Sequence, residues 1–285
     1  MIQILCFLIL CLCPLSWVHA DSLNQTWKES RQGVFVQPSQ YQVEQATQLF
    51  FDLFTNNNSN PEAWESLGMK VKYLHKKGQA FIVIQEQNNQ YHGRGFFAIR
   101  SEENHALLLQ APHAFKDLHT GRIALKLFQK SHAKAAAWNT VPRHYFADSE
   151  RVDADLAHRD NTFFTAFSHA FIQAYPQGKT LQLHGFSQKK RQSISAQQAD
   201  MILSSGQQYP SRTLQNLAHC LKRDQTQSIL IYPTDVQELG GTTNVIAKYI
   251  VQQRHHSFIH LEMSFETRKT LRHNTDMQHA LLQCL

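Results

Sequence analysis

The feature that most restricts the fold is a regular alternation of strand-like and helix-like segments that begins at Ala106 and continues to the end of the chain. Short apolar runs alternate with segments whose apolar residues recur at helical spacing. One helical segment, residues 161–175, carries an aromatic residue at every fourth position, at Phe163, Phe167, Phe171 and Tyr175. Such alternation predicts an α/β fold of three layers with a mostly parallel central mixed sheet. The strands are expected at 106–111, 133–138, 180–183, 201–204, 228–232 and 258–263, and the helices at 121–130, 161–175, 211–221 and 243–253.

The chain before this alternation has a different pattern. Residues 21 to about 60 are polar apart from one apolar helical stretch near 43–54. Three strand-like runs follow at 69–74, 80–85 and 95–100, and loop residues separate them. This spacing is typical of a small antiparallel meander. We therefore expect residues 21–105 to form a helix and meander packed on a main α/β domain of residues 106–285.

The first 20 residues are typical of a cleavable signal peptide. An almost unbroken apolar run extends from Ile4 to Leu15, and Val18-His19-Ala20 follows it with compact residues suited to a signal peptidase. The run is shorter than the roughly 20 residues of a membrane span. An uncleaved anchor is the alternative. Export predicts a periplasmic or secreted protein, and no later segment predicts stable insertion in a membrane.

Charge and cysteine content restrict the class of partner and the state of the cysteines. The formal net charge is +6, and only Lys189-Lys190-Arg191 forms a compact basic run, without interleaved aromatic residues. We therefore expect no nucleic-acid partner. After removal of the leader two cysteines remain, Cys220 and Cys284. In an oxidising compartment they can pair, or they can stay as two buried thiols. The oligomeric state cannot be read from the sequence.

Ionisable side chains follow several predicted strands, at the edge where open α/β sheets bind their ligands. His113 and Asp117 lie in the loop after the strand 106–111, and His184 ends the strand 180–183. Two histidines and a carboxylate from separate strand ends can bind zinc and leave one position for water. The alternatives are a hydrogen-bonding His113, an Asp117 that caps the next helix, and a buried His184 bonded to backbone.

The strand 258–263 carries a carboxylate among apolar residues. Period-two alternation places His260 and Glu262 on one face and Ile259, Leu261 and Met263 on the other. Burial of a carboxylate is costly unless it has a partner or a function. Glu262 beside a metal could take a proton from water and return it to a leaving amine. The structural alternative is an ion pair with Arg268.

A further group of charges follows the strand 133–138. Arg143 could hold a substrate carboxylate through its two-pronged guanidinium. Asp155 and His158 could orient a metal ligand from behind it. Alternatively, the segment 153–159 forms a solvated turn before the aromatic helix.

The order of these motifs resembles the N-formylglutamate amidohydrolase group of the zinc-carboxypeptidase-like fold. The matching pieces are Pro112-His113, Asp117, Leu183-His184-Gly185, the loop 239–244 and His260-Leu261-Glu262-Met263 followed by Arg268. They cover roughly 106–272. The resemblance implies a zinc ion held by His113, Asp117 and His184, Glu262 as general base, and a substrate site at Arg143, Gly241, Thr242 and Asn244. Many zinc carboxypeptidases use His-x-x-Glu; the carboxylate position here is Lys116, so the role passes to Asp117.

These features together predict an exported, zinc-dependent amidohydrolase or carboxypeptidase-like hydrolase of an amide or peptide bond. Its substrate would be a small molecule or peptide that bears a carboxylate, such as an N-acyl amino acid, a peptide or a γ-glutamyl compound. The alternative is a non-catalytic exported binding protein that uses the same crevice. A metal-free serine hydrolase has less support, because the chain contains no Gly-x-Ser-x-Gly elbow.

Overall fold

The structure is a computed structural model that describes residues 22–285 apart from 77–78, 103–104, 148, 225–226 and 256. The predicted signal peptide, residues 1–20, lies outside the described residues. Among the described residues, no helix combines the length and the apolar character that a membrane crossing requires.

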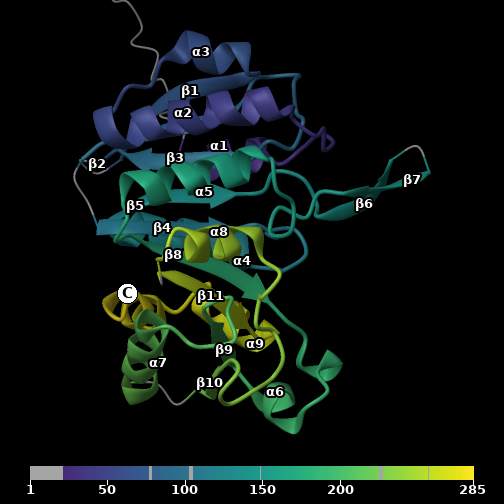
Figure 1. The fold of residues 1–285 in the computed structure, drawn as a ribbon, viewed down its shortest axis with the longest axis vertical. Helices are drawn as coiled ribbons and strands as arrows, with labels where there is room; N and C mark the ends of the chain where they lie inside the picture. Colours follow the sequence, from purple (N-terminus) through teal and green to yellow (C-terminus); the bar gives the residue numbers. More distant parts are fainter. Residues whose placement is uncertain (1–21, 77–78, 103–104, 148, 225–226, 256) are drawn as a thin grey trace, which may run out of the picture.

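One nine-stranded mixed sheet runs through the molecule, in the order β1-β2-β3-β5-β4-β8-β11-β9-β10 (Figure 1). The four central strands β5, β4, β8 and β11 are parallel to one another, and β9 pairs antiparallel with β11. This confirms the predicted α/β architecture. The strands are β1 (Met69–Lys76), β2 (Gln79–Glu86), β3 (Phe96–Arg100), β4 (His105–Ala111), β5 (Ala133–Trp138), β8 (Lys179–Gly185), β9 (Met201–Ser204), β10 (Ile229–Ile231) and β11 (Phe258–Met263).

The predicted antiparallel meander is formed by β1, β2 and β3. It does not make a sheet of its own, because β3 pairs antiparallel with β5 and so extends the central sheet. The edge of the α/β core is thereby covered by hydrogen-bonded strands rather than left open. The sequence pattern identifies the three strands but not the partner that the third one takes.

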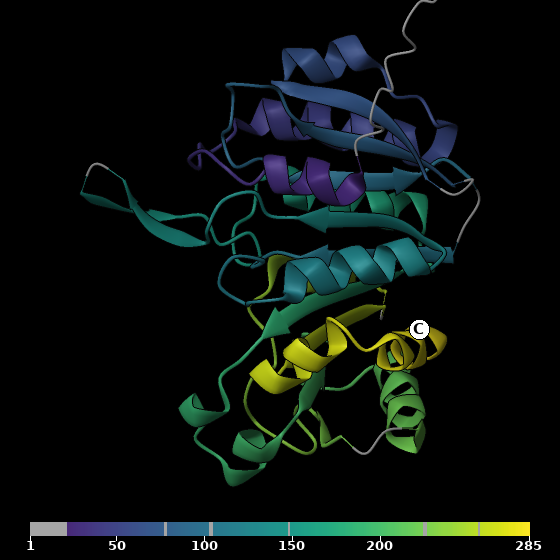
Figure 2. The same cartoon turned by 180° about the vertical axis from the view of Figure 1, so that it is seen from behind.

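Helices cover both faces of the sheet, as Figures 1 and 2 show from opposite sides. One face is packed by α2, α3, α5 and α8, and the other by α1, α4, α7, α9 and α10. Their bounds are α1 (Leu23–Glu29), α2 (Gln40–Asn56), α3 (Pro61–Ser66), α4 (Thr120–Lys130), α5 (Phe163–Ala174), α7 (Arg212–Asp224), α8 (Val245–Gln252), α9 (Phe265–Leu271) and α10 (Thr275–Gln283). Between β8 and β9 lie a short 3-10 helix (Gln188–Lys190) and α6 (Ile194–Gln198).

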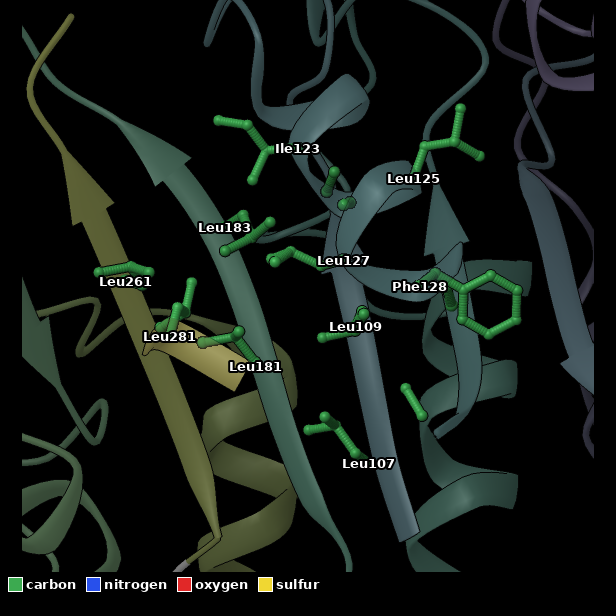
Figure 3. Packing of buried hydrophobic residues seen from close by; sticks show 14 of the residues in the cluster. Leu107, Leu109, Ile123, Leu125, Leu127, Phe128, Leu181, Leu183, Leu261 and Leu281 are labelled. Atoms are coloured by element: carbon green, nitrogen blue, oxygen red, sulfur yellow. The ribbon is translucent and has the colours of Figure 1, made fainter. Parts of the chain in front are cut away.

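The two faces of the central strands have different characters. Odd-numbered apolar residues of β4, β8 and β11 belong to one buried cluster with residues of α4 and α10, and Figure 3 shows Leu109, Leu183 and Leu261 among them. Each fully buried side chain of this size contributes about 1.5–3 kcal/mol to stability. Positions of the opposite parity on the same strands include a row of polar side chains, namely Gln110, Gln182, His184, His260 and Glu262, all of them buried. This row leads to the carboxyl edge of the parallel strands.

A hairpin that the sequence pattern does not indicate projects from the body of the protein (Figures 1 and 2). Its strands are β6 (His144–Ala147) and β7 (Glu150–Asp153), which pair only with each other. The sequence pattern predicts no element for 145–152, and the predicted solvated turn, 153–159, begins only at the last residue of β7. At the base of the hairpin the Ala154 amide donates to the Arg143 carbonyl over 2.7 Å. This pairing brings Arg143 and Asp155 to the same place.

Cys220 and Cys284 form a disulfide, with their Cα atoms 5.7 Å apart. The bond connects α7 to the residue that follows α10. Of the two alternatives that the sequence leaves open, the structure has the paired one.

Candidate active site

Loops at the carboxyl ends of the parallel strands enclose a cleft of about 1040 Å³. The predicted residues at its wall include His113, Asp117, His184 and Glu262, as well as Arg143 and His158. The loop 239–244 forms another part of the wall. The structure therefore brings to one cleft residues that come from five different segments of the chain.

His113 and Asp117 lie on a single turn of helical backbone after β4. The amides of Lys116 and Asp117 both donate to the His113 carbonyl, at 3.0 and 2.9 Å. This turn places residues four apart on one side. His113 Nδ1 and Asp117 Oδ2 are 3.5 Å apart as a result.

His184 completes a triangle of ligand atoms. Its Nδ1 lies 3.2 Å from His113 Nδ1 and 3.6 Å from Asp117 Oδ2. In a tetrahedral zinc site with bonds of about 2.0–2.2 Å, neighbouring ligand atoms are about 3.3–3.6 Å apart. Two imidazole nitrogens and one carboxylate oxygen are ligands that zinc prefers. The three residues thus fit the metal that the sequence predicts.

Hydrogen bonds on the far side of each ring determine which nitrogen faces the triangle. His113 Nε2 lies 2.7 Å from Asp155 Oδ1, and His184 Nε2 lies 2.7 Å from Gln182 Oε1. Both partners are oxygen acceptors, so each Nε2 carries the proton and each Nδ1 presents a lone pair. Metal-binding histidines are oriented in this way in proteins. Two lone pairs and a carboxylate that converge within 3.6 Å repel one another unless a cation lies between them.

Charge states within the cleft suit the same interpretation. Burial lowers the pKa of His184 to about 4, so this imidazole is neutral. Burial opposes ionisation of Asp117, but the neighbouring imidazoles of His113 and His184 outweigh it and hold the pKa of Asp117 well below its usual range. Burial also acts against the His113 cation, yet Asp117 and Asp155 raise the pKa of His113 above its ordinary value. A bound cation would take the place of that proton, because metal binding needs the neutral imidazole.

Glu262 lies on β11 directly beside His184 on β8. The ligand atoms of His184, His260 and Glu262 all lie within 4.8 Å of one another. Burial, followed by the charge of Asp117, raises the pKa of Glu262 to about 8. Glu262 Oε2 is buried and has no hydrogen-bond partner among the described residues. The ion pair with Arg268, which was the structural alternative to a catalytic role, does not form within 4.0 Å in the described part of the chain, which leaves Glu262 available for chemistry.

Asp155 and Arg143 both contact His113 from the base of the hairpin, Asp155 at Nε2 and Arg143 at Nδ1, the nitrogen that faces the triangle. Asp155 Oδ2 lies 3.4 Å from Arg143 Nε, and Arg143 Nη1 lies 3.3 Å from His113 Nδ1. Asp155 therefore lies where its predicted orienting role requires. His158 is exposed, and its Nδ1 lies 3.3 Å from Thr243 Oγ1 rather than beside a predicted metal ligand.

The loop 239–244, which contains Gly240 and Gly241, lies against His260. Gly241 has a φ of +59°, and a Cβ there would lie 3.0 Å from the His260 ring. Glycine is therefore required both by backbone conformation and by space. Thr242 is half-buried on the cleft wall. Asn244 is buried; its Oδ1 caps α8, and its Nδ2 donates to Gln182 Oε1 over 2.5 Å. These bonds connect the loop to the residue that orients His184.

Two residues of the site have no role in the sequence interpretation. Gln182 bonds to His184 and donates to Gln110 Oε1 over 2.9 Å. His260 lies against His184 with ring centroids 4.3 Å apart. A signal for both exists in the sequence, because Gln182 and His260 are each two residues before a predicted site residue in an otherwise apolar strand. Period-two alternation places such pairs on one face.

Gly185, directly after His184, is set by space rather than by backbone conformation, since it lacks a positive φ. A Cβ at this position would lie 1.1 Å from Arg268 Nη1. The side chain of Arg268 lies over the glycine, and this contact is the reason for the absence of a larger residue.

Comparison with known proteins gives structural neighbours only. No family model and no curated protein matches the chain. An N-formylglutamate amidohydrolase from Ralstonia eutropha JMP134 is 14% identical, with a TM-score of 0.44 over 67% of this chain and 96% of that one. A predicted carboxypeptidase from Burkholderia mallei ATCC 23344 is 11% identical, with a TM-score of 0.42 over 76% of this chain and 63% of that one. A predicted metallopeptidase from Shewanella amazonensis SB2B is 10% identical, with a TM-score of 0.36 over 79% of this chain and 91% of that one.

Proposed function

We propose that the protein is an exported zinc-dependent hydrolase that cleaves an amide or peptide bond in a carboxylate-bearing substrate. The observation that carries the proposal is the triangle of His113 Nδ1, Asp117 Oδ2 and His184 Nδ1, with sides of 3.2 to 3.6 Å. Its edges match those of a tetrahedral zinc site, and the triangle opens to a cleft large enough for a small ligand.

In this proposal His113, Asp117 and His184 hold the metal. A zinc ion so bound supplies a Lewis acid that polarises a carbonyl and lowers the pKa of water. Asp155 and Gln182 keep the two imidazoles in the required tautomer through their 2.7 Å bonds. The Gly185 amide donates to Asp117 Oδ2 over 3.1 Å and fixes the carboxylate.

Glu262 is the proton carrier. Its unpartnered Oε2 accepts a proton from the attacking water and then passes it to the nitrogen of the departing amine. A base is most effective when its pKa lies near the working pH, and burial has moved the pKa of Glu262 to about 8. The Glu262 side chain is 11% exposed and lines the cleft, so it can reach a water there while most of it is shielded from solvent.

Two features support export. The leader of residues 1–20 has the pattern of a signal peptide. The Cys220–Cys284 disulfide is of a kind that persists in oxidising compartments such as the periplasm or the cell exterior.

The test begins with metal analysis by mass spectrometry on untagged mature protein purified without a chelator. We expect about one equivalent of zinc, lost in the double variant His113→Ala/His184→Ala. His132→Ala, which removes an exposed histidine outside this cleft, is the matched control and should retain the metal. Zinc that remains in the double variant would disprove the site.

Turnover is tested next with N-acyl amino acids, peptides and γ-glutamyl compounds. Glu262→Gln should keep the zinc and lose activity, because the amide cannot accept the proton. If the wild-type protein binds such ligands but hydrolyses none of them, and Glu262→Gln binds them equally well, the protein is a binding protein rather than an enzyme.

A further inference from the structure

The cleft contains a second arginine, Arg268, in a setting unlike that of Arg143. Arg268 lies on α9, immediately after β11, and its side chain lines the cleft. The residue is only 5% exposed. Nevertheless its Nε and Nη1 atoms have no hydrogen-bond partner among the described residues. A buried guanidinium with unpaired donors is costly unless a ligand completes its bonds.

Arg143, in contrast, forms an ion pair with Asp155, although its Nε, like that of Arg268, has no hydrogen-bond partner of good geometry among the described residues. Its Nη1 faces His113 Nδ1 at 3.3 Å and its Nε faces Asp155 Oδ2 at 3.4 Å. Its side chain is 28% exposed. The ion pair with Asp155, which orients His113, engages the Arg143 guanidinium and leaves it less free than Arg268 to form a two-pronged contact with an incoming carboxylate.

The position of Arg268 is fixed by its neighbours. Its guanidinium lies over Gly185, where a Cβ would be 1.1 Å from Nη1. Gly185 follows His184 directly, and its amide holds Asp117. The free donors of Arg268 therefore lie beside the proposed metal site. Asp117 and Glu262 act on Arg268 through their charge, but neither forms an ion pair with it within 4.0 Å in the described part of the chain.

We propose that Arg268, and not Arg143, is the specificity-determining residue that binds the carboxylate of the substrate. The inference rests on the proposed function for the identity of the ligand. Two parallel N–H bonds to a carboxylate would satisfy the buried donors and orient the substrate. Arg143 is then a positioning residue, which holds Asp155 and through it His113.

Binding of a matched pair of probes tests this assignment without turnover. N-acetyl-L-alanine carries a carboxylate, and N-acetyl-L-alanine amide is its neutral counterpart. Titration calorimetry is performed in the Glu262→Gln background, so that the probes stay intact, and zinc content is measured for each preparation. We expect the acid to bind more tightly than the amide, and Arg268→Met to reduce this preference by about 10- to 100-fold.

Two further variants separate the possible causes. Arg143→Lys should keep the preference for the acid and should instead weaken zinc binding. Gly185→Ala retains the charge of Arg268 but displaces its guanidinium, so it should reduce the preference for the acid as Arg268→Met does. It therefore also tests the assignment if Arg268→Met folds poorly. Arg268→Lys, which keeps a charge but not the fork, should give an intermediate preference.

Three outcomes would overturn the assignment. They are equal binding of acid and amide to the parent protein, an unchanged preference in Arg268→Met and Gly185→Ala, and loss of the preference in Arg143→Lys. An acid preference that depends on Arg268 in a protein without hydrolytic activity would disprove the proposed function and leave this inference standing.

Discussion

Asp155→Asn should weaken zinc binding although the residue is not a predicted metal ligand. In the structure Asp155 Oδ1 accepts the Nε2 proton of His113 over 2.7 Å and also accepts the Ala157 amide. Asparagine has the same shape but lacks the charge that makes the bond to His113 strong. Its NH₂ group can also turn toward Nε2, which favours the tautomer with the proton on Nδ1, where the metal should bind.

The size of the effect follows from the bond that is lost. A hydrogen bond to a charged group is worth about 1.5–3 kcal/mol, and substitutions behind a metal ligand typically cost 10- to 100-fold in affinity, or about 1.4–2.7 kcal/mol. We therefore expect the dissociation constant for zinc to rise by about 10- to 100-fold. Removal of His113 itself should have a larger effect, because it deletes one of three ligands.

Competition with a fluorescent zinc chelator at fixed pH measures the affinity, and thermal unfolding of the metal-free protein checks that the variant folds. Asp153→Asn is the matched control: this more exposed carboxylate contacts His144 at 3.4 Å instead of His113, and the asparagine oxygen can still accept the Asp155 amide that Asp153 Oδ1 accepts over 3.0 Å. The reasoning is refuted if Asp155→Asn binds zinc within about twofold of wild type while His113→Ala loses it. It is also refuted if both asparagine variants lose equal affinity.

Three other predictions concern stability, each measured by urea denaturation. Burial raises the pKa of Glu262 to about 8 from the ordinary 4.5, so the folded metal-free protein keeps a proton that the unfolded chain has released. Its stability relative to Glu262→Gln should fall as pH rises from 4.5 to 8, by at most about 1.4 kcal/mol per pH unit; a pH-independent difference would contradict this. Replacing Cys284 by serine opens a bond across 64 residues and should cost about 2–4 kcal/mol, with no such loss expected under reducing conditions, where Cys220 is already unpaired. Phe50→Ala should lower the free energy of unfolding by about 3–5 kcal/mol, because the ring centroid of Phe50 lies 4.6 to 4.9 Å from those of three other aromatic rings. A decrease below about 1 kcal/mol would mean that α2 is not part of the core on that face of the sheet.

Local pattern was sufficient for most elements of the fold. The strands 133–138, 201–204 and 258–263 have the predicted bounds, because an apolar run between turn residues is a property of neighbouring residues. The hairpin of β6 and β7 was missed for the converse reason. Its strands are four residues each, and none of their described side chains is buried, so they carry no apolar periodicity from which a strand could be predicted.

The candidate site was predictable where a residue ends a strand. His113, Asp117, His184 and Glu262 follow or end apolar runs, and parallel strands bring such ends to one edge. The contacts that give these residues their chemical state were not predictable, even where alternation along a strand indicates a polar neighbour such as Gln182. Gln182 binds His184 because one imidazole nitrogen reaches back along β8, and Arg268 lies over Gly185 because α9 folds back beside β8.

The sequence alone therefore determined the class of fold, the identity of the strands of the nine-stranded sheet and the residue types at the strand ends, since periodicity and composition are properties of consecutive residues. Only the tertiary structure decided the strand order, the antiparallel setting of β9, the pairing of Cys220 with Cys284 and the convergence of three ligand atoms within 3.6 Å. Each of these is a contact between residues far apart in the chain. Such contacts depend on how the whole sheet buries its two faces, and no local pattern contains that information.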